Sequence, residues 1–249
     1  MTVRGFLVVV CLVASLIITG CLPQSKTNSP KDQSNLPVGL DNLEGMFSGF
    51  RDDFGGDECG GMCWDFYTFL PKNKVLIGLP ENGGPETIDC KRDECLDYSI
   101  SDGQLTLSNG ESYPIILEND TLIINKVKLN AVQPVPKGTT LDNHYTYIGY
   151  RGLIGVTGSS SSWTYSLSLY PDETFELSGV TLGSLGANTG VSTHTSSSGD
   201  AEKGNYKIEN NTITLTSNDG TVTPLLFFIH DSDVNDIQVG NKNYYVKED

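Results

Sequence analysis

The feature that most constrains this chain is a strand-and-turn pattern near its C-terminus that recurs far upstream. In residues 204–246, short segments alternate apolar with polar side chains and are separated by tight polar turns. Residues 98–124 follow the same plan, with Asp-Gly and Asn-Gly turns. Period-two alternation predicts half-buried strands, and these dipeptides between two strands predict hairpins. The pattern therefore predicts an antiparallel meander.

The recurrence also covers the segments that precede these strands. Residues 47–50 (Phe-Ser-Gly-Phe) align with 147–150 (Tyr-Ile-Gly-Tyr), Trp64 with Trp163, and 70–71 (Leu-Pro) with 170–171 (Tyr-Pro). A fixed order of matching segments predicts a duplicated domain. Gly, Ser, Thr and Asn are abundant and no helical periodicity is present. We therefore expect an all-β protein of two tandem antiparallel meander barrels or sandwiches.

The N-terminus has the pattern of an export signal. Arg4 precedes an apolar run, residues 5–18, which is too short to span a bilayer comfortably. The run ends in Ile-Thr-Gly-Cys at residues 18–21, and small residues before a cysteine indicate a processing site. We therefore expect residues 1–20 to be a signal peptide.

This processing site resembles the lipobox of bacterial lipoproteins. The resemblance implies cleavage after Gly20 and a diacylglyceryl thioether on Cys21, and two or three acyl chains anchor a protein stably. An ordinary secretory signal with a chance cysteine is the alternative. Residues 21–43 are rich in Pro, Ser, Asn and Gln and predict a flexible tether. We therefore expect a lipid anchor in the bacterial cell envelope, with the chain facing outside the cytoplasm.

The rest of the chain divides at a connector that contains Pro134, Pro136 and Gly138. We expect a first β-domain at residues 44–130, a linker at 131–143 and a second β-domain at 144–249. In the second domain, the segment 179–199 is rich in Gly, Ser and Thr and predicts an exposed loop.

Two long loops of the first domain carry four cysteines, Cys59 and Cys63 in one and Cys90 and Cys95 in the other. In an exported chain, four cysteines predict two disulfides with three possible connectivities. Bridges between the loops would restrict the unfolded chain more, and local pairing within each loop stays open. A zinc site with four thiolates competes, but the C-x3-C and C-x4-C spacings and the oxidising compartment disfavour it.

The net charge of −15 disfavours nucleic-acid binding, because an acidic surface repels the phosphate backbone. Carboxylates crowd the two cysteine loops, and we call the following set the acidic rim. It consists of Asp52, Asp53, Asp57, Glu58, Asp89, Asp93 and Glu94. Such a rim can bind calcium or a cationic partner, although a solvated face that keeps the protein soluble is the simpler interpretation.

The sequence contains no recognisable catalytic motif. The three histidines lack a G-x-S-x-G neighbour, and there is no phosphate-binding or dinucleotide-binding glycine loop. Residues 231–236 begin like a calcium-binding EF-hand loop, but Asp236 stands where that loop needs glycine and Lys242 where it needs glutamate. We therefore expect no enzyme activity, no cofactor and no metal site.

The Pro-Asp turn at 171–172 and the G-x-Y-x-I segment at 204–208 resemble the lipocalin-like domains of bacterial lipoproteins. The resemblance covers residues 144–249 well and 44–130 more loosely, and it implies small antiparallel barrels or sandwiches. The expected function is a binding module for a small apolar ligand or for a protein partner. An inhibitor or protective surface protein that binds a cationic enzyme or peptide through the acidic rim is the alternative, and a hydrolase is the least favoured hypothesis.

Overall fold

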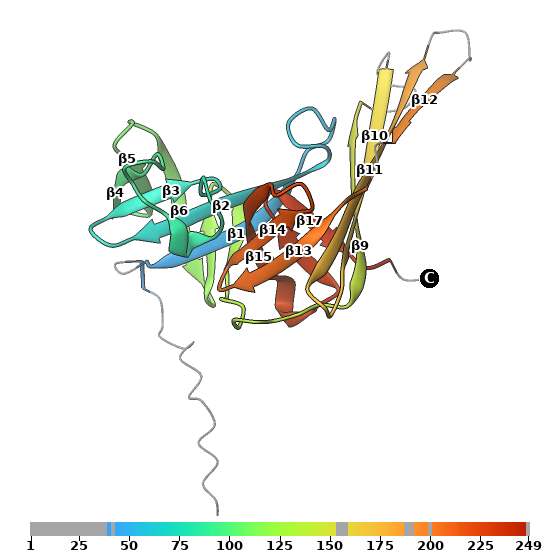
Figure 1. Ribbon diagram of the computed structural model, residues 1–249. Helices are drawn as coiled ribbons and strands as arrows, with labels where there is room; N and C mark the ends of the chain where they lie inside the picture. Colours follow the sequence, from blue (N-terminus) through green and yellow to red (C-terminus); the bar gives the residue numbers. More distant parts are fainter. Residues whose placement is uncertain (1–38, 41–42, 153–158, 187–191, 199–200, 248–249) are drawn as a thin grey trace, which may run out of the picture. The chain divides into compact units, whose positions relative to one another are not determined.

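The computed structural model describes residues 39–40, 43–152, 159–186, 192–198 and 201–247 (Figure 1). The expected signal peptide, Cys21 and almost all of the expected tether lie outside these residues. Within them, the regular elements are β-strands, apart from short 3₁₀ segments such as η2 (Pro85–Thr87) and η3 (His230–Ser232). In this described part of the chain, no helix has the length and apolarity that a membrane crossing needs.

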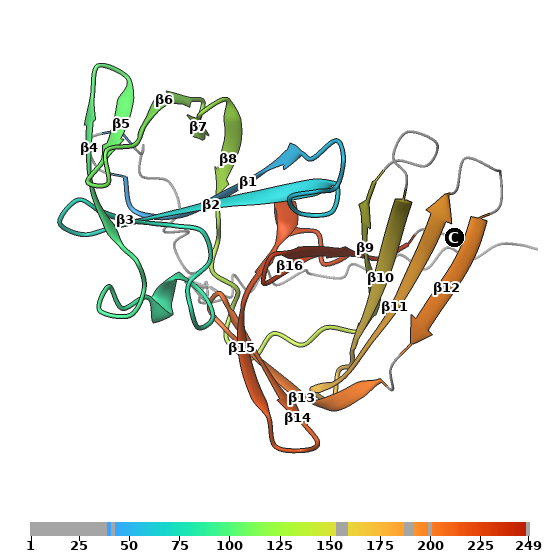
Figure 2. The ribbon, with the colours of Figure 1, turned by 90° about the horizontal axis from the view of Figure 1, so that it is seen from above.

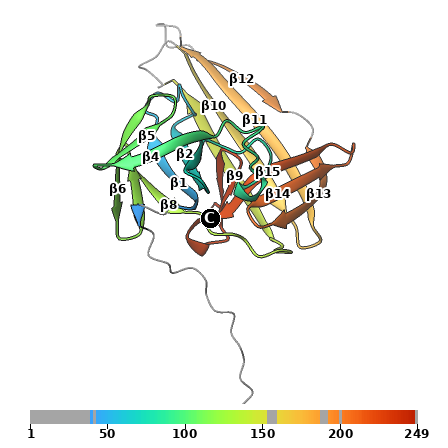
Figure 3. The ribbon, with the colours of Figure 1, turned by 90° about the vertical axis from the view of Figure 1, so that its left-hand side faces the viewer.

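The first half of the chain forms a closed antiparallel barrel of consecutive strands. Its strands are β1 (Gly45–Asp52), β2 (Met62–Leu70), β3 (Lys74–Ile77), β4 (Leu96–Ser101), β5 (Gln104–Leu107), β6 (Ser112–Glu118), β7 (Thr121–Ile124) and β8 (Val127–Ala131). Strands β4, β5 and β6 follow one another around the barrel (Figure 3). The barrel closes where Phe47 and Ser48 pair with Ala131 and Asn130.

The second half repeats this plan with one additional strand. Its strands are β9 (Asn143–Arg151), β10 (Ser159–Leu169), β11 (Thr174–Gly186), β12 (Ser192–Ser198), β13 (Glu202–Glu209), β14 (Thr212–Ser217), β15 (Val222–Ile229), β16 (Asp236–Val239) and β17 (Lys242–Tyr245). Pairing of β10 with β11 and of β9 with β17 closes the ring. The expected pair of tandem all-β barrels is therefore confirmed.

The expected Gly/Ser/Thr-rich loop at 179–199 is wrong in part. Strand β11 continues to Gly186, and its distal half pairs with β10 on one side and with β12 on the other (Figure 2). The composition predicts a loop because glycine and serine have low strand propensity, but ladder pairing along β10 keeps this segment extended. Tertiary pairing outweighs local propensity here.

The hairpin turns show how the two barrels correspond. Leu70 pairs with Lys74 across one turn, and the Tyr170 N–H donates to the Thr174 carbonyl across the other at 3.0 Å, so these hairpins superpose. In this register Phe47 opposite Tyr67 corresponds to Tyr145 opposite Leu167. The duplication predicted from the sequence is supported. The expected match of residues 47–50 with 147–150 is displaced by two, and that of Trp64 with Trp163 by one, because Thr164 occupies the position equivalent to Trp64.

Every buried residue of the first core has a buried counterpart in the second. The pairs are Leu43/Leu141, Phe47/Tyr145, Tyr67/Leu167, Phe69/Leu169, Val75/Phe175, Leu105/Ile213, Leu107/Leu215, Ile115/Phe227, Leu122/Ile237, Ile124/Val239 and Leu129/Tyr244. Each barrel therefore buries one apolar face of its strands inward, as closed small barrels require.

The expected linker packs against the second barrel. Val135 forms a bridge with Asn210, and the Leu141 N–H donates to the Tyr206 hydroxyl at 2.8 Å. Val135 and Leu141 both belong to the second core. Residues 37–249 accordingly form one compact unit.

Candidate functional site

The four cysteines of the first barrel form two local disulfides, Cys59–Cys63 and Cys90–Cys95, with Cα atoms 5.3 Å and 5.2 Å apart. The disulfides expected from the sequence are confirmed, and the pairing is local, which the sequence left open. The Asp53 carboxylate lies within 4.8 Å of the Cys59 and Cys63 sulfurs, but a disulfide has no thiolate to offer a metal.

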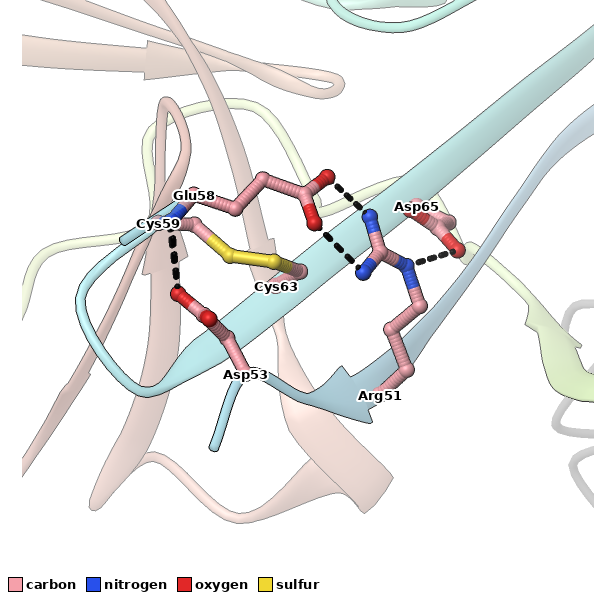
Figure 4. Close-up of polar contacts among 6 residues, drawn as sticks. All are labelled: Arg51, Asp53, Glu58, Cys59, Cys63 and Asp65. Atoms are coloured by element: carbon pink, nitrogen blue, oxygen red, sulfur yellow. Dashed lines mark hydrogen bonds and ion pairs between the residues drawn. A yellow bond between two sulfur atoms is a disulfide. The ribbon is translucent and has the colours of Figure 1, made fainter. Parts of the chain in front are cut away.

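Asp53 organises the first cysteine loop from inside. Its Oδ2 accepts the backbone N–H groups of Cys59 at 2.9 Å and Glu58 at 3.0 Å (Figure 4). These backbone donors, led by Cys59, hold the pKa of Asp53 below its usual range. The carboxylate therefore stabilises the loop that bears the disulfide.

Arg51 lies between two carboxylates at the base of the same loop. Its Nη1 donates to Glu58 Oε2 at 2.9 Å and its Nε to Asp65 Oδ2 at 3.2 Å (Figure 4). The bond from Arg51 lowers the pKa of Glu58, whereas partial burial raises the pKa of Asp65 despite the nearby guanidinium. Glu58 thus already has a cationic partner within the chain.

This first cysteine loop also attaches to the second barrel. The Gly60 and Gly55 carbonyls accept the Tyr150 and Gly152 N–H groups at 3.0 Å and 2.8 Å, along the edge of β9. Asp57 forms an ion pair with Arg151 at 3.1 Å. We call residues 53–61 the first strap, because they fasten one barrel to the other.

The second cysteine loop makes a comparable attachment through residues 83–86, the second strap. The Gly84 N–H donates to Thr212 Oγ1 at 2.9 Å. Glu86 Oε1 accepts the Asn211 N–H at 3.1 Å and the Thr212 hydroxyl at 2.6 Å. Both loops that distinguish the first barrel from the second thus contact the second barrel.

Asp93 stabilises the second cysteine loop internally. It is 7 % exposed, and it accepts the N–H groups of Glu81 at 2.8 Å and Asp89 at 2.7 Å. Burial opposes ionisation of Asp93, but these backbone donors outweigh it and hold its pKa below the usual range. Asp89 accepts the Lys91 N–H at 3.1 Å.

The acidic rim is therefore split by its contacts. Asp53, Asp57, Glu58, Asp89 and Asp93 all have partners within the chain. Glu94 is exposed, and Asp52, which directly precedes the first strap, lines a groove between the barrels. The rim is not one converging surface of uncommitted carboxylates.

The barrels meet through outward-facing apolar side chains. Met46 and Phe66 of the first barrel pack against Leu226 and Phe228 of the second, and all four are buried. Trp64 packs against this cluster and is only partly buried. The apolar contact thus runs out into a region that solvent reaches.

That region is a groove of about 830 Å³, which we call the inter-barrel groove. It is lined by β1, β2 and β8 on one side and by β15, η3 and β16–β17 on the other. Its lining includes Phe50, Trp64, His230, Asp236 and Asn243. A site of this volume falls within the range of about 300–1,000 Å³ that is common for ligand sites.

A row of aromatic rings crosses the groove. The ring centroids of Phe50 and Trp64 are 5.6 Å apart, those of Trp64 and His230 4.7 Å, and those of Phe228 and His230 4.8 Å. The Phe50 side of the row opens to solvent, because this residue is 55 % exposed. An aromatic ring held by neighbours and open on one side is ready to stack with a ligand.

The hydrogen bonds around His230 fix its tautomer. Gln238 is fully buried, and its Nε2 donates to the Gly240 carbonyl at 3.0 Å. The Gln238 Oε1 therefore faces His230 Nε2, 3.2 Å away, which assigns a proton to Nε2. His230 Nδ1 is left as a hydrogen-bond acceptor on a groove-lining side chain.

No protein family, curated protein or solved structure matches this chain.

The interior of the first barrel is occupied by buried core side chains such as Phe47, Phe69 and Leu122. In the second barrel, Lys242 lies on the inner face, with its Nζ 5.9 Å and 5.6 Å from the ring centroids of Tyr147 and Tyr165. Burial lowers the pKa of Lys242, and its Nζ donates to Asn241 Oδ1 at 3.2 Å. These contacts satisfy the lysine within the chain.

His144 and Ser168 form a histidine–serine hydrogen bond at 2.6 Å. The serine is 9 % exposed, and no described carboxylate is bonded to His144. A hydrolytic triad needs an accessible nucleophile and an acid that orients the histidine. This pair meets neither requirement.

Sequence reasoning missed the groove, although a signal for it was present. Met46, Phe50, Trp64 and Phe66 occupy outward positions of the β1–β2 hairpin, where an exposed barrel face should be polar. Apolar residues on both faces of one hairpin indicate that something covers the outer face. Only the fold brings His230 beside Trp64.

Proposed function

We propose that this chain is a binding module without catalysis and that its ligand site is the inter-barrel groove. The observation that carries the proposal is the solvent-open aromatic row, in which Phe50 is held against Trp64 yet is 55 % exposed. Exposed apolar side chains gathered in a concave, partly polar site are characteristic of binding surfaces.

The inter-barrel groove is better suited to bind a ligand than the two sites expected from the sequence, which are the barrel interior and the acidic rim. An apolar ligand inside the first barrel would have to displace a filled core, which costs several kcal/mol in lost packing. A cationic partner at the acidic rim would have to compete with Arg51 and Arg151 for Glu58 and Asp57. We keep the rim as a second, weaker candidate because the net charge of −15 favours cationic partners over long distances.

We further propose that the module works at the cell envelope, anchored to the membrane by a lipid on Cys21. The support is the cleavage motif at residues 18–21 that follows the apolar run. Expression in a bacterial host with labelled palmitate tests this anchor. Label in the wild-type protein and none in Cys21→Ala is expected, and equal label in both would refute it.

The two tryptophans provide the test of the binding site, because Trp64 lines the groove and Trp163 does not. Indole N–H signals of the ¹⁵N-labelled protein would be followed against a library of neutral sugars, amphiphiles and short peptides. Ligands of the groove shift the Trp64 signal, and Phe50→Ala weakens them. A library without effect on Trp64, or with effects that Phe50→Ala leaves unchanged, contradicts the proposal.

A further inference from the structure

We infer that the ligand of the inter-barrel groove is a neutral oligosaccharide. This inference rests on the groove being the binding site, and it adds the chemical class of the ligand. Three properties of the groove lead to it: its balance of charge, its fixed hydrogen-bonding groups and its one open aromatic face.

The charge of the groove is nearly balanced, although the chain as a whole is strongly acidic. Lys126 and Lys128 line it, and so do Asp52, Asp231 and Asp236. Arg51 also lines it, but Glu58 and Asp65 already neutralise its guanidinium, so the remaining sum is −1. The whole chain has a net charge of −15. A site for a cationic or anionic ligand would carry an excess of the opposite charge. The balance favours an uncharged ligand.

The polar groups of the groove are oriented before any ligand arrives. His230 Nδ1 is left as an acceptor because Nε2 is bonded to the buried Gln238. Asn243 Nδ2 donates to Asp236 Oδ1 and to the Ile237 carbonyl, which leaves its Oδ1 as an acceptor on a groove-lining side chain. Lysine ammonium groups supply donors. Oriented acceptors next to donors match hydroxyl groups, each of which both donates and accepts.

The exposed side of Phe50 supplies the apolar part of the site. The face of an aromatic ring carries partial negative charge, and the C–H groups on one face of a pyranose ring carry partial positive charge. Trp64 already lies between Phe50 and His230, so Phe50 is the ring with an open side. A sugar stacked there would bring its hydroxyls toward His230 and Asn243 on the same groove.

The test uses three neutral probes, maltohexaose, cellohexaose and fully N-acetylated chitohexaose, titrated into the full-length protein while the indole signals of Trp64 and Trp163 are recorded. At least one probe is expected to shift Trp64 and to leave Trp163 unmoved. Phe50→Ala is expected to weaken that binding at least tenfold, and His230→Phe, which keeps a ring but removes the acceptor, several-fold. His144→Phe, on a surface outside the groove, is the matched control and leaves binding unchanged.

Two further measurements separate the possible failures. Binding of a neutral sugar stays constant between 50 and 500 mM salt, whereas a charged ligand weakens as salt screens it. If only peptides or amphiphiles shift Trp64, the sugar class is wrong and the groove stands as a site. If nothing shifts Trp64, both proposals fall. A ¹⁵N spectrum with the proton of His230 on Nδ1 would overturn the hydrogen-bonding argument by itself.

Discussion

Thr68 and Ser168 occupy equivalent positions of the two barrels, and we predict that deleting their hydroxyls has opposite effects. Met46 lies directly opposite Thr68 on β1, and His144 lies directly opposite Ser168 on β9. His144 gives the Ser168 hydroxyl a hydrogen-bond partner at 2.6 Å. Methionine gives Thr68 none, and its Oγ1 is the one buried side-chain polar atom without a partner in the described residues.

The size of the expected stability change follows from the burial of Thr68, which is 1 % exposed. A buried hydroxyl without a hydrogen bond costs about 1–3 kcal/mol in protein mutational data. Valine has the shape of threonine and lacks the hydroxyl, so Thr68→Val should raise the free energy of unfolding by about 1–2 kcal/mol. For a protein of this size the midpoint of thermal unfolding should rise by about 2–8 °C. Ser168→Ala removes a satisfied hydroxyl and should lower stability by about 1 kcal/mol.

Urea unfolding followed by tryptophan fluorescence measures both variants, and equal denaturant slopes would confirm that only stability changed. The signs of the two changes in unfolding free energy test the prediction, because both substitutions delete one hydroxyl at equivalent positions. A destabilising Thr68→Val would mean that the hydroxyl has a partner after all. A neutral Ser168→Ala would mean that the bond to His144 contributes nothing.

Three further predictions concern the straps and the cores. Glu86→Ala removes two hydrogen bonds of the second strap and should lower the free energy of unfolding by about 1 kcal/mol, measured in urea. Gly60→Ala should cost about 2–4 kcal/mol, because Gly60 has φ of +84° and a Cβ there would lie 2.6 Å from the Trp163 ring. Burial raises the pKa of Tyr67 and Tyr145 to about 12 from an ordinary 10.0, so the unfolded chain loses these protons first and stability should fall as pH rises between those values. Each tyrosine contributes a slope of about 1.4 kcal/mol per pH unit, which alkaline urea titrations would detect.

Matched variants serve as controls for these predictions. Glu94→Ala, in the same loop as Glu86 but outside the second strap, should leave stability unchanged. Gly78→Ala has the same backbone strain as Gly60→Ala, with φ of +97°, but nothing lies within 4 Å of the added carbon. Equal losses at Gly78 and Gly60 would show that the contact with Trp163 is unimportant. A flat stability profile across the alkaline range would contradict the assignment of the two tyrosines.

Local chemistry made much of the fold predictable. Asp102, Asn119 and Asn210 adopt positive φ at the turns that the sequence indicated, and these residues tolerate that conformation better than most. The alternation of Leu105 and Leu107 on β5 places both in the core, as a period of two requires. Turn residues and alternation act over a few positions, so they can be read from the sequence alone.

The candidate site depends on contacts that no local pattern encodes. Local cysteine pairing follows from loops that fold back within a few residues, and composition did not distinguish this from bridging between loops. Asp57 was grouped with a partner-binding rim because it is acidic, but Arg151 of the other barrel neutralises it. Trp64 and His230 come together only when two outer barrel faces dock. Such contacts join residues far apart in sequence and depend on the register of both barrels.

The contact between the barrels joins two different faces, and a contact of this kind can in principle be repeated with further copies. The outer face of β1–β2 in one repeat covers β15 of the other, so the same geometry applied again would add repeat after repeat into an open filament. The corresponding outer face of the second repeat is polar and does not support this addition. At its positions equivalent to Met46, Trp64 and Phe66 it carries His144, Thr164 and Ser166. These polar side chains offer no apolar surface on which a further copy could dock in the same way.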